Sequence, residues 1–318
     1  MLEGLHIRRR FVERLGCIKG CLEHLGQDIS FPWLYGGTGH AFIISLDPGV
    51  DVSSPDSWDH QPQYELGHNL GYRIDGLQTW AADLSDDVLR KKQREAWDFV
   101  RDHIDRDIPC FGFELKAYYG GYWVITGYDD VGYYYSGWEE GGPLPWDKLG
   151  TLFIPNLEVH AVELCPAAPD VKTVRDGLNY ALRHAQNPAE WIDKQAKSGP
   201  AAWVYWAKAL ETGEAKRDHH TYNLKLWLEC REMAVAFCRE AKARLPGRCD
   251  ARFDEAAAHY ATVCTVLRSA IALHPERDEP DWGPDATFAS AEAAALIRQA
   301  AEADAAGLAA LAQILEAL

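Results

Sequence analysis

Two apolar, β-rich runs near the middle of the chain constrain its fold most. They cover residues 108–115 and 122–127, and a short turn that ends in glycine joins the second run to the aromatic residues 133–135. Isoleucine, valine and aromatic residues favour strands, and a glycine-containing turn between two such runs is typical of a hairpin. Because side chains alternate between the two faces of a strand, we expect the hairpin to hold Tyr122 and Ser136 rigidly at one edge of a sheet.

The composition is that of a globular protein with enough length for two hydrophobic cores. Of the 318 residues, 47% are hydrophobic and 25% are charged. The formal net charge of -16 argues against a phosphate backbone or an anionic membrane surface as partner, since both require clustered lysine and arginine. The chain also lacks an uncharged apolar stretch of about 18 residues. We therefore expect a cytoplasmic protein that binds a small molecule or a peptide, and neither nucleic acid nor a membrane.

No pattern in the sequence points to a metal or a cofactor. The eight cysteines are scattered through apolar surroundings without a CxxC pair, which indicates neither a zinc site nor a disulfide framework. His60 and His68 have a spacing that matches no standard metal site. The glycine-rich residues 36–39 lack both the GxGxxG spacing and the following Lys-Ser/Thr of a phosphate-binding loop. We expect no metal and no cofactor.

The composition changes near residue 168, where we predict a domain boundary. Residues 169–318 are rich in Ala, Glu, Arg and Leu with a helical period, and they follow a segment with nearly all the glycine-rich turns. We expect an α+β domain over residues 1–168 and an antiparallel helical bundle over residues 169–318. The apolar helical faces of the bundle also allow a homodimer. The predicted helices cover residues 171–184, 201–210, 227–245, 253–271 and 290–318.

The first part of the chain mixes helices with glycine-rich and polar segments. Residues 10–25 read as a helix that ends at Gly26, and residues 84–104 as a second helix. Between them we expect a glycine-rich turn that enters a strand over residues 30–45. A long polar loop then follows, of a kind that often acts as a lid or binding element; it contains Asp56, Trp58, His60, Tyr64, His68 and Asn69.

This order resembles the papain-like fold of the bacteriocin-leader cysteine peptidases. It is more closely similar to the N-terminal domain of the butirosin-biosynthesis aminoacyl-acyltransferase family, whose helical C-terminal domain resembles residues 170–318. The matching elements are a helix that ends in glycine, a Leu-x-Gly-x-x-Gly-x-x-Phe loop and a late Gly-Tyr-Asp. In this chain they correspond to Cys17-Ile18, Leu22, Gly26, residues 34–42 and Gly127-Tyr128-Asp129. The resemblance implies a papain-like domain with an antiparallel sheet.

The resemblance also implies where a catalytic triad would stand. Counting back from Gly26 places Glu13 at the nucleophile position of the family, Tyr122 at the general-base position and Ser136 at the position of the orienting Asp or Asn. A carboxylate cannot replace a thiolate in acyl transfer. Tyrosine, with an ordinary pKa of about 10, is a poor base at neutral pH. The three positions therefore carry the wrong chemistry for a cysteine peptidase.

Two functional hypotheses follow. In the first, the chain is a pseudoenzyme whose inherited cleft binds a small molecule or peptide, with rings suited to a flat, cationic or amide-rich ligand. The candidate binding residues are Glu13, Glu114, Tyr122, Asp129, Ser136, Trp33 and Tyr35. In the second, the chain is an acyl or aminoacyl transferase, or an amide hydrolase, that uses a relocated pair of Cys17 and His40 or an unconventional pair of Glu13 and Tyr122. A solvent-accessible Cys17 sulfur near an imidazole favours the second hypothesis, and a buried sulfur favours the first.

Overall fold

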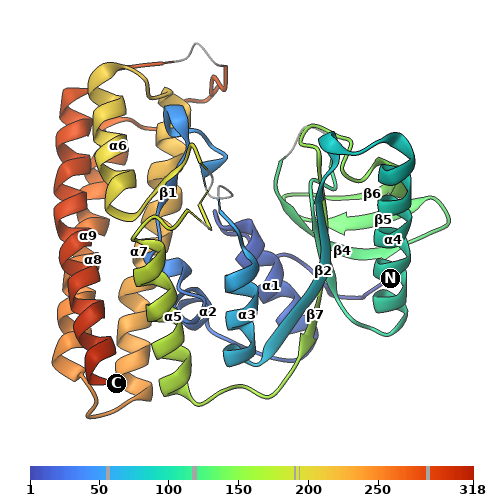
Figure 1. Cartoon of the computed structure of the whole chain (residues 1–318), viewed down its shortest axis with the longest axis horizontal. Helices are drawn as coiled ribbons and strands as arrows, with labels where there is room; N and C mark the ends of the chain where they lie inside the picture. The colour runs from blue at the N-terminus through green and yellow to red at the C-terminus, as the bar shows by residue number, and fades with distance from the viewer. Residues whose placement is uncertain (55–57, 117–119, 190, 193, 284–286) are drawn as a thin grey trace. The chain divides into compact units, whose positions relative to one another are not determined.

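The chain folds into an α+β protein with antiparallel sheets and a helical C-terminal region (Figure 1). The computed structural model describes residues 1–54, 58–116, 120–189, 191–192, 194–283 and 287–318. Two compact units are present. Unit 1 comprises Met1–Ser30 and Gly71–Ala167, and unit 2 comprises Phe31–Leu70 and Ala168–Leu318. Residues 31–70, which composition assigns to the first domain, thus group with the helical unit, because their contacts are made with helices distant in the sequence.

Unit 1 is built on a six-stranded sheet with the order β2-β7-β3-β4-β5-β6, in which every neighbouring pair is antiparallel. The predicted hairpin is confirmed, and it places Val124 opposite Ser136. The strands are β2 (Tyr72–Trp80), β3 (Cys110–Phe113), β4 (Tyr122–Tyr128), β5 (Gly132–Ser136), β6 (Glu140–Pro145) and β7 (Asn156–Leu164).

Two helices pack on this sheet. They are α1 (Glu13–His24), which contacts β4, β7 and β3, and α4 (Asp86–Asp105), which contacts β7 and β3. Both were expected from their helical period. In α4, apolar side chains recur on one face, where the Trp97 ring lies 5.0 Å from the ring of Tyr133. The core of unit 1 therefore lies between the sheet and these two helices.

Unit 2 contains the predicted helical bundle, in which α6 to α9 run side by side in Figure 1. The helices are α5 (Asp170–His184), α6 (Gly199–Thr212), α7 (Arg217–Arg244), α8 (Asp250–Leu273) and α9 (Ala291–Ala317). By length and composition alone α8 has the character of a membrane-crossing helix, but it packs against α7 and α9 as a bundle core helix does. Helix α7 starts ten residues before the apolar periodicity that predicted it, because its first turns bury hydrogen-bonded polar side chains such as Asp218 and Asn223.

Residues 31–70 differ from the expectation. The predicted glycine-rich turn and polar loop are wrong for most of this segment. It forms two helices, α2 (Phe31–Gly37) and α3 (Gln61–Leu70). It also forms a two-residue strand, β1 (Ser45–Leu46), which pairs with β8 (Lys197–Ser198). Asp56 of the expected loop lies outside the described residues. Glycine in α2 serves close packing: a Cβ on Gly36 would lie 2.0 Å from the Phe237 ring.

Candidate functional site

The residues singled out in the sequence are divided between the two units. Unit 1 holds Glu13, Cys17, Glu114, Tyr122, Asp129 and Ser136, and unit 2 holds Trp33, Tyr35 and His40.

In unit 1, Glu13 and Tyr122 meet where α1 begins beside the start of β4. The Glu13 carboxylate accepts hydrogen bonds from the Tyr122 backbone N–H at 3.0 Å and from the Trp138 indole N–H at 2.5 Å. Trp138 is 44% exposed, and the Arg9 guanidinium lies 5.3 Å from its ring centre. A carboxylate at the first position of a helix is favoured by the helix dipole. The result is an acidic group beside an exposed aromatic ring that already holds one cation.

The Tyr122 hydroxyl points to a second carboxylate that the sequence analysis missed. It donates to Glu158, whose oxygens lie 3.1 and 3.3 Å away. Glu158 is fully buried and also accepts from Asn156 Nδ2 at 2.8 Å and contacts His160 Nε2 at 2.8 Å. Burial acts to raise the pKa of Glu158, but the His160 and Asn156 hydrogen bonds outweigh it, so that the pKa lies below its ordinary value. The Tyr122 hydroxyl, as a donor to this carboxylate, is poorly placed to act as a base.

The Glu158 cluster has a sequence signal, although a weak one. Asn156, Glu158 and His160 alternate with apolar residues in β7 and so share one face. Across the ladder, Gly76 of β2 pairs with His160, and a Cβ on this glycine would lie 2.2 Å from His160 Nδ1. The glycine therefore makes room for the imidazole ring.

The remaining acidic candidates of unit 1 have structural partners. Glu114 accepts from the backbone N–H groups of Phe153 and Ile154 at 2.9 and 2.7 Å, and burial raises the pKa of its carboxyl although these bonds oppose the shift. Asp129 lies in the turn between β4 and β5, where Val131 N–H and Gly132 N–H donate to it and lower its pKa. Ser136 is buried in β5. Glu114 and Asp129 therefore hold neighbouring backbone segments in place.

Cys17 lies one turn after Glu13 in α1 and is completely buried. Burial raises the pKa of its thiol well above the ordinary value, and the nearby Cys21 and Glu13 raise it further. A nucleophilic thiolate requires the opposite surroundings, namely exposure and nearby positive charge.

In unit 2, His40 and the two candidate aromatic residues make packing contacts. His40 is completely buried, with its Nδ1 atom 3.1 Å from Gln63 Nε2 and its ring edge-on to Tyr35. The Tyr35 hydroxyl donates to Glu229 at 2.6 Å, and Trp33 stacks on Phe237. These contacts join residues 31–42 to α7.

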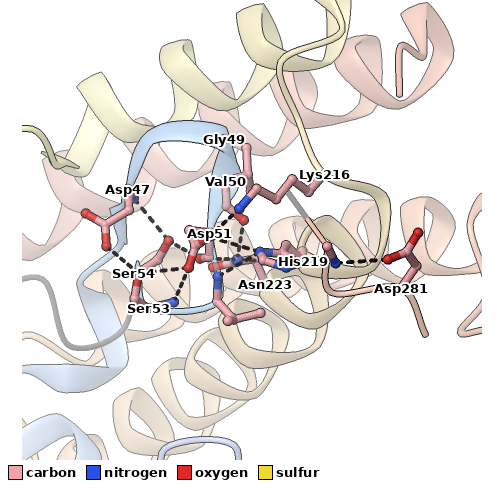
Figure 2. Close-up of polar contacts among 12 residues, drawn as sticks. Asp47, Gly49, Val50, Asp51, Ser53, Ser54, Lys216, His219, Asn223 and Asp281 are labelled. Carbon is pink, nitrogen blue, oxygen red and sulfur yellow. Dashed lines mark hydrogen bonds and ion pairs between the residues drawn. The ribbon is translucent and has the colours of Figure 1, made fainter. Parts of the chain in front are cut away.

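A polar cluster fastens residues 47–54 to the start of α7 (Figure 2). The Asp51 carboxylate lies 2.8 Å from Lys216 Nζ and 3.2 Å from His219 Nδ1. Burial would raise the pKa of Asp51, but these two partners and Ser53 lower it well below its usual range. Asn223 Nδ2 donates to the carbonyls of Val50 and Asp51, both at 3.0 Å.

An open depression of about 680 Å³ lies beside the cluster, lined by Asp47, Pro48, Asp51, Ser53, Lys194 and Gln195. Its two carboxylates already have partners, since Asp51 pairs with Lys216 and Asp47 accepts a hydrogen bond from the Ser53 hydroxyl (Figure 2). The cluster therefore accounts for the position of residues 47–54 against the start of α7.

Within the part of the chain that the structure describes, no group of three His, Cys, Asp or Glu side chains is arranged to hold a metal ion. No protein-family model and no curated protein sequence matches the chain.

Proposed function

We propose that this chain is a papain-like-fold protein whose catalytic triad has been replaced and which binds a small molecule or peptide at the inherited site. The observation that supports this most is Glu13, which stands at the first position of α1 with its carboxylate bound to Tyr122 and Trp138. Acyl transfer needs a thiolate beside a base. In this chain the acid Glu13 stands at the nucleophile position. The general-base position holds Tyr122, whose hydroxyl is hydrogen-bonded to Glu158.

The alternative, a relocated Cys17 and His40 pair, fits the geometry less well. The two residues belong to different units, and both side chains are completely buried. Burial also holds the Cys17 thiol in its neutral form. Transferase or hydrolase activity of this kind is therefore the second candidate.

The chemistry around Glu13 favours a cationic ligand. A carboxylate beside an exposed indole suits a guanidinium or ammonium group, as the position of Arg9 over Trp138 illustrates within the chain itself. The net charge of -16 also attracts cations over a distance. The eight cysteines, all among the described residues, carry free thiols, which is typical of a reducing compartment, so a cytoplasmic location is part of the proposal. A homodimer through apolar helical faces of unit 2 stays a prediction.

Labelling with iodoacetamide at neutral pH tests the loss of cysteine chemistry. We expect Cys17 to stay unmodified in native protein and to react after unfolding in urea. The partly exposed Cys165 and Cys249 serve as internal controls, because they should react in the native state. Rapid labelling of Cys17 in native protein would contradict the proposal and favour the transferase.

Titration with agmatine, a small guanidinium amine, tests the binding site. Isothermal calorimetry should show binding to the native chain and about tenfold weaker binding to Trp138→Ala, which corresponds to about 1.4 kcal/mol. Trp80→Ala is the matched control, since Trp80 is an exposed tryptophan at the end of β2 in the same unit, whereas Trp138 lies between β5 and β6. If native mass spectrometry finds neither agmatine nor a co-purified compound on the protein, the binding proposal is wrong.

A further inference from the structure

The two edges of the six-stranded sheet differ in whether a further strand can pair with them. At one edge, β6 contains Pro143 and Pro145, and its register with β5 shifts between Tyr133 and Tyr135. Proline lacks the N–H that a further strand needs, and a bulge bends an edge out of line. At the other edge, β2 contains no proline and pairs with β7 without interruption over its whole length. β2 is therefore the edge at which a further strand can pair.

Half of the backbone groups of β2 face away from the sheet. Directly before β2, the Gly71 carbonyl accepts from Cys165 N–H at 2.9 Å, and directly after it Ala81 N–H donates to residue 155. Because bonded and non-bonded pairs alternate in an antiparallel ladder, odd-numbered residues of β2 bond to β7 and even-numbered residues direct their N–H and C=O outward. No hydrogen-bond partner among the described residues meets these outward groups on Ile74, Gly76, Gln78 and Trp80.

The side chains of this segment complement themselves. In an antiparallel pair with a second copy centred on Leu77, that residue meets its own symmetry mate, and Ile74 lies opposite Trp80 of the second copy. Ile74 and Leu77 are half-buried in the single chain, and Trp80 is 51% exposed. Asp75 lies opposite Thr79, whose hydroxyl can donate to the carboxylate. Pairing therefore covers apolar side chains and sets no like charges opposite each other.

Other registers are less favourable. A pair centred on Asp75 sets two carboxylates directly opposite each other, which destabilises a sheet. A pair centred on Gly76 requires the backbone of Tyr72 to bond to Trp80 of the second copy, but Tyr72 is completely buried. The pair centred on Leu77 uses only residues 74–80, all of which are at least partly exposed.

We propose that residues 74–80 of β2 form a dimerisation site, at which a second copy of the chain adds its own β2 as an antiparallel strand centred on Leu77. The interface is isologous, since each copy presents the same segment to the other, and it joins the two sheets into one. It differs from the dimer predicted through the helical faces of unit 2, which does not involve β2. The inference does not rest on the ligand site, because Trp138 lies between β5 and β6, at the opposite edge of the sheet.

Sedimentation equilibrium of the full chain tests the dimer. We expect a reversible equilibrium between the 35.6 kDa chain and a species of twice that mass. Gln78→Pro removes an outward N–H from each copy and leaves the bonds from β2 to β7 in place, so it should weaken association about 100-fold. A full chain that is monomeric at about 100 µM, or a dimer that Gln78→Pro leaves unchanged, would overturn the proposal.

Two tryptophan variants separate this site from the ligand site. Trp80→Ala should weaken association about tenfold and leave agmatine binding unchanged. Trp138→Ala is the matched control, which should weaken agmatine binding and leave association unchanged. If Trp80→Ala and Trp138→Ala have the same association constant, Trp80 does not lie in the interface and the proposal fails.

A charge series tests the register and covers the case in which Gln78→Pro does not fold. Thr79→Lys places an ammonium opposite Asp75 of the second copy and should tighten association about fivefold. Adding Asp75→Lys to this variant sets like charges opposite each other and should weaken association about tenfold relative to Thr79→Lys. Long-range repulsion between two copies with a net charge of -16 predicts the opposite order, because each lysine lowers that charge. Tighter association of the double variant would therefore show that β2 does not pair in this way.

Discussion

Arg231 and Asp304 form an ion pair in the interior of unit 2, with 0% and 1% side-chain exposure. Arg231 Nε lies 2.6 Å from the carboxylate, and its Nη1 donates to the carbonyls of Ala41 and Ile43 at 3.2 and 2.7 Å. The indole N–H of Trp203 donates to the second carboxylate oxygen at 2.9 Å. Such a pair tolerates burial because hydrogen bonds satisfy the Asp304 carboxylate and the Nε and Nη1 atoms of Arg231, although the buried Nη2 atom has no hydrogen-bond partner among the described residues.

Removal of one partner should therefore be far costlier than removal of an exposed pair. We expect Asp304→Asn to lower the free energy of unfolding by about 3–5 kcal/mol, because it leaves the guanidinium buried without a counter-charge. Urea unfolding followed by circular dichroism measures this change. Arg298→Gln is the control, since its pair with Glu211 is exposed and should contribute nothing measurable. A loss below about 1 kcal/mol for Asp304→Asn would show that water or a rearranged side chain compensates the charge.

At the scale of elements, glycine fixes how closely α2 approaches its neighbours. A Cβ on Gly36 would overlap the Phe237 ring of α7, and one on Gly177 of α5 would lie 2.5 Å from the Gly36 carbonyl oxygen. Alanine is favoured over glycine in an isolated helix by about 1 kcal/mol. We nevertheless expect Gly36→Ala to lower the melting temperature and to cost about 1–3 kcal/mol through overpacking. A stabilised variant in differential scanning calorimetry would contradict this packing.

The elements that the sequence predicts well are those whose signal is local. The helices of residues 169–318 and α4 follow from apolar residues at helical spacing, and β4 and β5 follow from two apolar runs joined by a glycine turn. Helix α2 was missed because its glycines resemble a turn, and they become helical only through contacts with Phe237 and Gly177. Those contacts are distant in sequence, so no local pattern reports them.

In the candidate site, too, the sequence predicts some contacts and misses those between segments that are distant in the chain. The counted spacing placed Glu13 and Tyr122 together, and a hydrogen bond joins them in the structure. The resemblance places Ser136, on the following strand, at the family's orienting position, whereas in the structure the Tyr122 hydroxyl is bound by Glu158 of β7. Strand β7 adds to the sheet beside β3, a pairing between distant segments that the sequence pattern does not specify.

At the scale of the whole molecule, buried imidazoles should make stability sensitive to acid. Burial lowers the pKa of His184 to about 3, and burial together with His274 and Arg217 lowers that of His220 to about 3. An unfolded histidine has a pKa of about 6.5. Between these values the unfolded chain binds protons that the folded chain does not, so stability is lost as the pH falls below about 6.5.

The imidazoles of His184 and His220 can each contribute up to about 1.4 kcal/mol per pH unit to the slope of the unfolding free energy against pH. The free energy of unfolding, measured in urea, should therefore fall between about pH 8 and about pH 5. In His184→Gln this fall should be less steep, by the contribution of one proton. If His184→Gln has the slope of the native chain, the ring is protonated in the folded state.

The path of the chain between the units gives a last prediction. Residues 31–70 lie between two segments of unit 1 but depend on unit 2. Arg231 satisfies the carbonyls of Ala41 and Ile43, and Asn223 satisfies those of Val50 and Asp51. A fragment of residues 1–168 loses these donors, and buried carbonyls without partners are costly. We expect limited proteolysis to cleave residues 31–70 rapidly in this fragment and slowly in the full chain.

A redesigned unit 1 provides the control for this experiment. Residues 1–30 joined by a short Gly/Ser linker to residues 71–167 keep the whole sheet together with α1 and α4. The join is short, since Gln27 Nε2 lies 2.9 Å from the position of a Cβ on Gly71. This protein should unfold cooperatively in urea, whereas the 1–168 fragment should aggregate through its exposed apolar residues 31–46. Equal protection of residues 31–70 in the fragment and in the full chain would show that unit 1 holds this segment without the helical bundle.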